Sequence, residues 1–63
     1  MSIGENIKKL REAAGMSQDE LARAVGVGQN AISKIEAGTR FPSVITLRNI
    51  ARVFGVTTDS LYE

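Results

Sequence analysis

The sequence contains no cysteine and no histidine, and it holds a single proline. Without cysteine the chain has neither a disulfide staple nor a thiolate metal site. Without histidine it lacks the commonest general base and the commonest metal ligand. A phosphate-cradling glycine pattern is also missing. These absences argue against an enzyme, and we expect neither a cofactor nor a bound metal.

Long hydrophobic runs are missing as well. No apolar stretch approaches the roughly 20 residues of a membrane span, and the first residues do not form the apolar segment of a signal peptide. We therefore expect a cytoplasmic protein without membrane association. The chain has 63 residues, which predicts a single domain over residues 1–63 near the lower size limit for folding alone. A second copy that buries further apolar surface is therefore favoured.

Start and stop signals divide the chain into five helical segments, and β-hairpin signals are absent. The predicted segments run from Ser2 to Ala14, from Ser17 to Val25, from Gln29 to Ala37, from Ser43 to Phe54, and over a short turn that begins at Thr57. Serine followed three residues later by glutamate, at Ser2 and at Ser17, has capping-box spacing. The expected core face of the fourth segment is Val44, Leu47, Ile50, Ala51 and Phe54. The predicted fold class is all-α.

The most informative stretch runs from Gln18 to Ala37, where two short helices are joined by a turn centred on Gly26. Ala22 stands where the two helices are expected to cross, and its small side chain permits a close approach. Gly26 supplies the positive φ that a sharp turn needs. The apolar residues expected beneath the crossing are Leu21, Val25, Val27, Ile32 and Ile35. This spacing predicts a helix-turn-helix whose second helix stands clear of the body.

On these residues the chain resembles the phage-repressor and Cro-like (XRE-type) helix-turn-helix family, and the resemblance extends over nearly the whole chain. The segments that carry it are Ile7–Arg11, Gly15–Ala22, Gly26–Val27, Ile32–Gly38, Arg40, Pro42–Ser43, Leu47, Ile50–Ala51 and Gly55–Val56. The resemblance implies a compact five-helix bundle of the lambda-repressor-like DNA-binding type, with its third helix in the major groove. It also implies a homodimer on a palindromic double-stranded DNA operator. The implied function is a sequence-specific transcriptional regulator, in the first instance a repressor.

The third segment carries a polar stripe that is suited to reading bases. With its isoleucines buried, the residues that point outward are Gln29, Asn30, Ser33 and Lys34. A Gln or Asn amide pairs with adenine N7 and N6 at once, and a lysine ammonium donates to guanine N7 and O6. We expect Gln29 and Asn30 to read adenine-containing steps and Lys34 to read a guanine, while Ser33 pairs with either. The alternative is an ordinary solvated helix face.

Phosphate contacts are expected beside the groove. Gln18 lies in the first turn of its helix, where unpaired N–H groups and the positive helix end attract a phosphate, and the resemblance makes its side chain a phosphate contact too. Thr39 and Arg40 follow the recognition helix and are expected to hold the DNA backbone beyond it. The resemblance also implies a structural ion pair between Arg11 and Glu36, with two unrelated surface charges as the alternative.

The last part of the chain is more apolar than a short terminal segment needs, and Ile45 stands where the family usually has a polar residue. We expect a two-fold interface drawn from Ile45, Val56, Leu61 and Tyr62. Closing the small core is the alternative, and for Leu61 it is the favoured one. Another class of function also stays open, in which the same fold is a protein-interaction module that binds a toxin, an antirepressor or a transcription factor. Salt dependence separates the two functions, because binding affinity falls steeply as salt rises only where binding is driven by neutralising phosphates.

Overall fold

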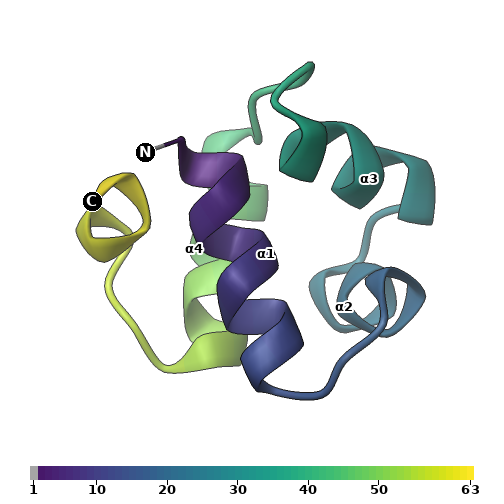
Figure 1. The fold of residues 1–63 in the computed structure, drawn as a ribbon, viewed down its shortest axis with the longest axis horizontal. Coiled ribbons are helices and arrows are strands. Elements are labelled where there is room, and N and C mark those ends of the chain that lie inside the picture. Colours follow the sequence, from purple (N-terminus) through teal and green to yellow (C-terminus); the bar gives the residue numbers. More distant parts are fainter. Residues whose placement is uncertain (1) are drawn as a thin grey trace.

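The computed structural model describes residues 2–63. Over these residues the chain forms four α-helices and one 3-10 helix: α1 (Ile3–Ala13), α2 (Gln18–Val25), α3 (Gln29–Ala37), α4 (Val44–Phe54) and η1 (Asp59–Tyr62). Figure 1 shows α1 packed in front of α4, with α2 and α3 on one side of this pair and η1 on the other. Between residues 2 and 63, no helix has the length and apolar character needed to cross a membrane.

The all-α architecture is confirmed, but the five-helix bundle is wrong in its last element. The segment after α4 opens with a turn, in which the Thr57 hydroxyl accepts the N–H of Ser60 at 3.2 Å. It continues only as the four-residue 3-10 helix η1. Four residues cannot close a succession of i to i+4 hydrogen bonds, so the tighter i to i+3 pattern is favoured over an α-helix.

Local capping explains where the helices begin. At the start of α2 the Ser17 hydroxyl accepts the N–H of Glu20 at 3.0 Å, and the Glu20 carboxylate accepts the N–H of Ser17 at 2.8 Å. An equivalent capping box between Ser2 and Glu5 begins α1. Both predicted boxes are therefore confirmed. In contrast, α3 follows Gly28 and begins without a side-chain cap.

The core collects apolar side chains from all five elements. Its buried members are Ile7, Leu21, Ala22, Val25, Ile32, Ile35, Leu47, Ile50, Ala51 and Leu61. The residues expected beneath the crossing of α2 and α3 are among them, except that Val27 is only partly buried. The prediction was wrong for Val44, whose residue is 82% exposed. Val44 is the first residue of α4, and no neighbouring element covers its side chain there.

The turn between α2 and α3 depends on Gly26, whose φ of 88° lies in the left-handed region. The N–H groups of Gly26 and Val27 both donate to the carbonyl of Ala22, at 2.8 and 3.0 Å. The chain can reverse sharply at this point because glycine adopts this φ without strain, whereas a residue with a side chain would not. Ala22, 1% exposed, lies in the buried core where the helices meet. The predicted helix-turn-helix geometry is thus present, and it sets the direction of α3.

A second glycine allows a close approach that the sequence analysis missed. Gly4 lies in the first turn of α1, and its backbone packs directly against the C-terminal end of α3. A Cβ atom built on Gly4 would collide with the carbonyl oxygen of Ile35 and would lie 3.0 Å from that of Glu36. A glycine within a helix, where propensity disfavours it, was the available signal. This contact fixes the far end of α3 against α1.

Candidate nucleic-acid interface

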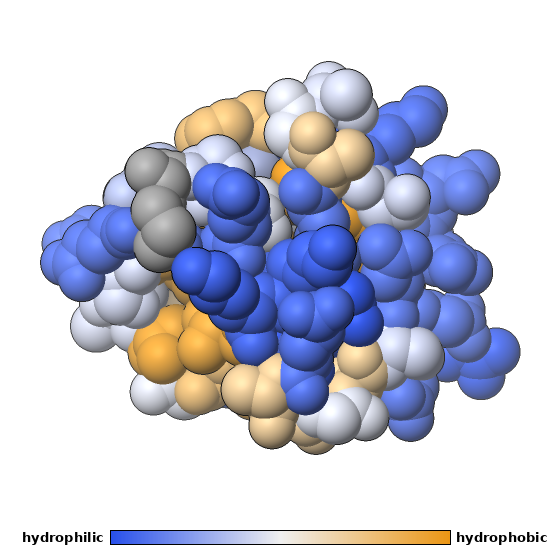
Figure 2. All heavy atoms as spheres, viewed as in Figure 1, coloured by the Kyte–Doolittle hydropathy of each residue, from blue (hydrophilic) through white to orange (hydrophobic). Residues whose placement is uncertain are grey.

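The candidate interface starts from the outward face of α3. The opposite, buried face of α3 consists of Ile32, Ile35 and Glu36. The polar stripe predicted from the sequence is exposed throughout and consists of Gln29, Asn30, Ser33 and Lys34. Because these residues are spaced i, i+1, i+4 and i+5, they share one face of the helix. Figure 2 shows hydrophilic side chains projecting along the edge of the molecule that α2 and α3 form in Figure 1.

The beginning of α2 adds unpaired backbone donors to this edge. The first N–H groups of a helix have no partner within the helix, and the Ser17 hydroxyl takes only that of Glu20. The backbone N–H groups of Gln18 and Asp19 make no hydrogen bond to another described residue. They stand at the positive end of the helix dipole, where an anion is stabilised. The Asp19 carboxylate is paired with Arg23 at 3.1 Å, on the exposed surface.

A buried ion pair connects α1 to α3. Arg11 Nε donates to Glu36 Oε2 at 2.7 Å, and Arg11 Nη2 donates to Glu36 Oε1 at 3.1 Å. The third donor, Nη1, reaches the carbonyl oxygen of Met16 at 2.8 Å. The Arg11 side chain is 11% exposed and the Glu36 side chain 3%. The hydrogen bond to Glu36 holds the pKa of the Arg11 guanidinium above its usual value. The positive charge of Arg11 therefore lies against the acid on α3, with Nε 2.7 Å from Oε2.

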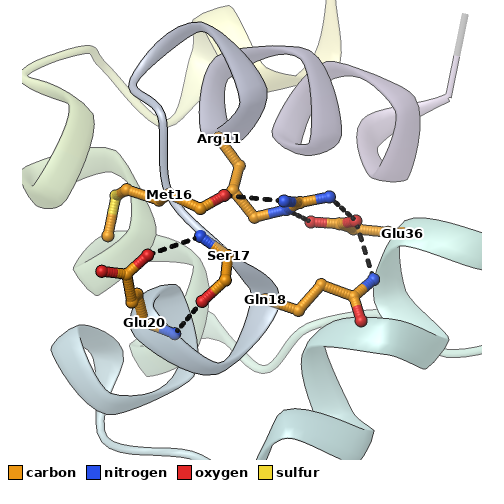
Figure 3. Close-up of polar contacts among 6 residues, drawn as sticks. All are labelled: Arg11, Met16, Ser17, Gln18, Glu20 and Glu36. Carbon is orange, nitrogen blue, oxygen red and sulfur yellow. Dashed lines mark hydrogen bonds and ion pairs between the residues drawn. The ribbon is translucent and has the colours of Figure 1, made fainter.

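Gln18 completes this cluster. Its Nε2 donates to Glu36 Oε1 at 3.1 Å, so that the carboxylate accepts from both Arg11 and Gln18 (Figure 3). The resemblance implied the pair of Arg11 and Glu36, whereas Gln18 was predicted only as a phosphate contact. No pattern in the chain links residues 18 and 36, because they come together only where α2 packs beside α3. Within residues 2–63, every buried side-chain nitrogen and oxygen has a hydrogen-bond partner.

Thr39 and Arg40, which follow Gly38 at the end of α3, both lie at the surface, but only Thr39 makes hydrogen bonds to the helix. Gly38 ends α3 with a left-handed φ of 82°. The Thr39 hydroxyl donates to the carbonyl of Lys34 at 3.2 Å, and the Thr39 N–H donates to the same oxygen at 3.0 Å. Thr39 therefore closes the end of the helix. Arg40 is exposed at the rim of a hollow of about 370 Å³ that Phe41 also lines.

The residues expected at a two-fold interface are divided between surface and core. Ile45 is 67% exposed and Tyr62 51%. Val56 is half-buried and packs against the core. Leu61 is completely buried, which agrees with the alternative favoured for it: its side chain fills the core and is not available to an interface. Asn6 Nδ2 donates to the Leu61 carbonyl at 2.8 Å, which anchors η1 on α1.

Two further apolar residues are also exposed. Phe41 is 65% exposed, Val44 is 82% exposed, and neither was singled out for an interface from the sequence. The rings of Phe41 and Tyr62 lie 6.3 Å apart between centroids, tilted by 35°. This ring contact brings the loop before α4 together with η1. We call the exposed residues Phe41, Val44, Ile45 and Tyr62 the apolar surface.

Comparison with known proteins agrees with this architecture. A sequence model described as helix-turn-helix matches residues 7–61. The HTH-type transcriptional regulator ImmR of Bacillus subtilis is 36% identical over 61 residues, which make up 97% of this chain and 48% of ImmR. The chain therefore spans about half the length of that relative.

Solved structures share the fold and differ in what they are bound to. The P22 c2 repressor, solved with a synthetic operator, superposes with a TM-score of 0.95 at 27% identity, covering 100% of this chain and 96% of that one. SinR of Bacillus subtilis, a master regulator for biofilm formation solved with DNA, gives a TM-score of 0.87 at 35% identity, covering 94% and 95%. SinR has also been solved in complex with the protein SinI, with a TM-score of 0.88 and coverage of 94% and 58%.

Proposed function

Because the chain belongs to the helix-turn-helix family, we propose that it is a sequence-specific transcriptional regulator, most simply a repressor, that binds a palindromic DNA operator as a homodimer. One observation carries the proposal: α3 exposes a polar stripe, and the start of α2, with its unpaired N–H groups, lies beside α3, since Gln18 Nε2 reaches Glu36 Oε1 at 3.1 Å. A helix that is exposed at the surface of the domain fits the major groove of DNA, and a helix N-terminus binds phosphate.

Base reading is assigned to the stripe of α3. Gln29 and Asn30 each offer a donor and an acceptor, which matches the N7 and N6 edge of adenine. Lys34 offers donors only, which matches the N7 and O6 acceptors of guanine. Ser33 lies between them and pairs with either kind of base. The neutralisation of Glu36 by Arg11 supports this assignment, because an unpaired acid on α3 would repel the phosphates of the groove.

Phosphate binding is assigned to the two ends of the helix pair. At the start of α2, the side chain and backbone N–H of Gln18 provide donors at the positive helix end. Beyond α3, Arg40 provides an exposed charge and Thr39 provides a hydroxyl whose proton is already donated to α3. We therefore give Arg40 the larger share of the contact on that side.

Dimerisation is assigned to the apolar surface. Ile45 and Tyr62 form its expected part, and Phe41 and Val44 extend it. Val56, which is half-buried, stays an expected member of the interface, while Leu61 fills the core. Two copies related by a two-fold axis would present their α3 helices about 34 Å apart, one turn of DNA, which matches a palindromic operator.

Selection from a pool of random DNA duplexes tests the proposal. We expect an enriched sequence made of two inverted half-sites about one helical turn apart, bound with an affinity that falls steeply as salt rises. Recovery of no enriched sequence, together with salt-insensitive binding or none, would refute a sequence-specific DNA reader. A single unpaired half-site would refute the dimer alone.

A protein-interaction module is the second candidate function. It is favoured by the apolar surface, whose residues are all at least half exposed, and by the net charge of only +1. SinR shows that one protein of this fold has been solved both with DNA and with a protein. Binding to a partner through an apolar surface responds little to salt, so the same titration separates the two functions.

A further inference from the structure

We propose that Glu36 positions the side-chain amide of Gln18 for binding a DNA phosphate, so that the buried ion pair takes part in DNA binding as well as in folding. The inference rests on the proposed function, because it concerns a phosphate contact. It goes beyond that function by making Glu36, which is buried and cannot touch DNA itself, a positioning residue.

The hydrogen-bonding chemistry of the two groups fixes how the amide is turned. An ionised carboxylate only accepts hydrogen bonds, whereas Gln Nε2 carries two N–H groups. Nε2 of Gln18 donates to Glu36 Oε1 at 3.1 Å. Glu36 therefore holds the NH₂ end of the Gln18 amide inward and accepts a hydrogen bond from one of its two N–H groups. Because the two N–H bonds of a planar amide diverge, the second proton stays available to another acceptor.

The support is rigid because Glu36 is itself held from the other side. Arg11 grips both oxygens of the carboxylate and also reaches the carbonyl of Met16. A glutamine side chain has much rotamer freedom, and losing it on binding weakens a contact. The hydrogen bond to Glu36 already restricts the Gln18 side chain in the protein without DNA, so less rotamer freedom is lost on binding.

The chain offers a matched comparison in Gln29. Gln18 and Gln29 are each the first residue of their helix, α2 and α3. Both belong to the proposed DNA-binding edge. Gln18 is bound to Glu36, whereas the side chain of Gln29 is exposed and makes no hydrogen bond to another described residue. A positioning role of Glu36 must therefore affect Gln18 and leave Gln29 unaffected.

The test is a double-mutant cycle on DNA affinity. The background is the combined change Arg11→Met and Glu36→Met, which removes both charges, keeps the net charge and fills a similar volume; replacing a buried ion pair in this way is often tolerated. Gln18→Ala and Gln29→Ala are each introduced into the native chain and into this background. Affinity is measured by fluorescence anisotropy on the duplex that the selection enriches and on a mixed-sequence duplex of about 20 base pairs, two turns of DNA. Unfolding by urea is followed separately, so that affinities are compared between folded proteins.

We expect Gln18→Ala to weaken binding to both duplexes about 10-fold in the native chain, as for a hydrogen bond to a charged group, and by about 2-fold or less in the apolar background. Gln29→Ala should cost the same factor in both backgrounds. An equal loss from Gln18→Ala in both backgrounds would overturn the inference, and so would a larger loss in the apolar one, which would mean that Glu36 holds the amide away from DNA. Failure of the native chain to bind either duplex would instead overturn the proposed function.

A second measurement applies even where the apolar background fails to fold. In the native protein without DNA, the side-chain NH₂ protons of Gln18 should exchange with solvent more slowly than those of Gln29, because Gln18 is bound to Glu36. On adding the duplex, the Gln18 resonances should shift while their protection is kept. Equal exchange at the two glutamines, or loss of protection at Gln18 on binding, would overturn the inference.

Discussion

Removing Arg11 alone should cost this protein most of its stability. In Arg11→Met the Glu36 carboxylate keeps only the hydrogen bond from Gln18 and stays buried, with its side chain 3% exposed. The carbonyl of Met16 loses a donor at 2.8 Å as well. Breaking a buried pair by removing one partner costs about 3–5 kcal/mol, because an uncompensated charge is left behind.

The size of the chain turns this cost into a large thermal effect. A domain of this length has a free energy of unfolding of about 3–9 kcal/mol, from about 0.05–0.15 kcal/mol per residue. Each kcal/mol lowers the Tm of such a small domain by about 4–8 °C. Arg11→Met should therefore lower the Tm by at least about 12 °C in a circular-dichroism melt. The combined change Arg11→Met and Glu36→Met should restore most of the loss, since no charge then stays buried.

A surface ion pair provides the control. Arg23 Nε lies 3.1 Å from Asp19 Oδ2, a length close to that of the buried pair, but the two side chains are 82% and 51% exposed. Arg23→Met should cost less than about 1 kcal/mol. If Arg11→Met and Arg23→Met melt within a few degrees of each other, the reasoning from burial is refuted.

The remaining predictions concern packing, specificity, pH and assembly. Gly4→Ala should destabilise the fold by about 1–3 kcal/mol in urea unfolding, because the added Cβ meets the backbone of α3; unchanged stability would contradict the close approach. Lys34→Ala should cost about 1–3 kcal/mol of DNA affinity and relax preference at one base pair, whereas equal weakening on all sequences would make Lys34 a phosphate contact. The hydrogen bond from the Ser17 N–H lowers the pKa of Glu20 in the folded protein. The stability that Glu20 contributes is therefore present above the unfolded glutamate pKa of about 4.3 and is lost as pH falls through the lower folded pKa. Glu20→Gln should lose less stability on acidification than the native chain does, and an unchanged pH profile of the Tm would count against this role of Glu20. Ile45→Glu should shift sedimentation at micromolar concentration from dimer towards monomer without lowering the Tm of the monomer, because Ile45 is 67% exposed; a dimer that persists would place the interface elsewhere.

The residues of the candidate site were predictable where their exposure follows from helical periodicity. Burying Ile32 and Ile35 turns Gln29 and Lys34 to the opposite side of α3, and both are exposed. Their pairing with particular bases stays a prediction. The ion pair of Arg11 and Glu36 followed only from the resemblance, since nothing local joins residues on two different helices.

The order and bounds of the α-helices were readable from the chain alone because capping and turn signals act between neighbours. The box between Ser17 and Glu20 spans three residues, and the left-handed turn at Gly26 depends on that residue's own backbone. Such interactions form wherever the segment goes, so they need no knowledge of the rest of the fold.

Tertiary structure alone decided which groups meet across helices. The amide of Gln18 reaches Glu36, and Gly4 admits the end of α3, because of the angles and distances at which α1, α2 and α3 cross. In the same way Leu61 is buried and Val44 is left at the surface, although both are apolar residues near the ends of their elements. Burial depends on whether another element covers a side chain, and that coverage is a property of the assembled helices and not of the local sequence.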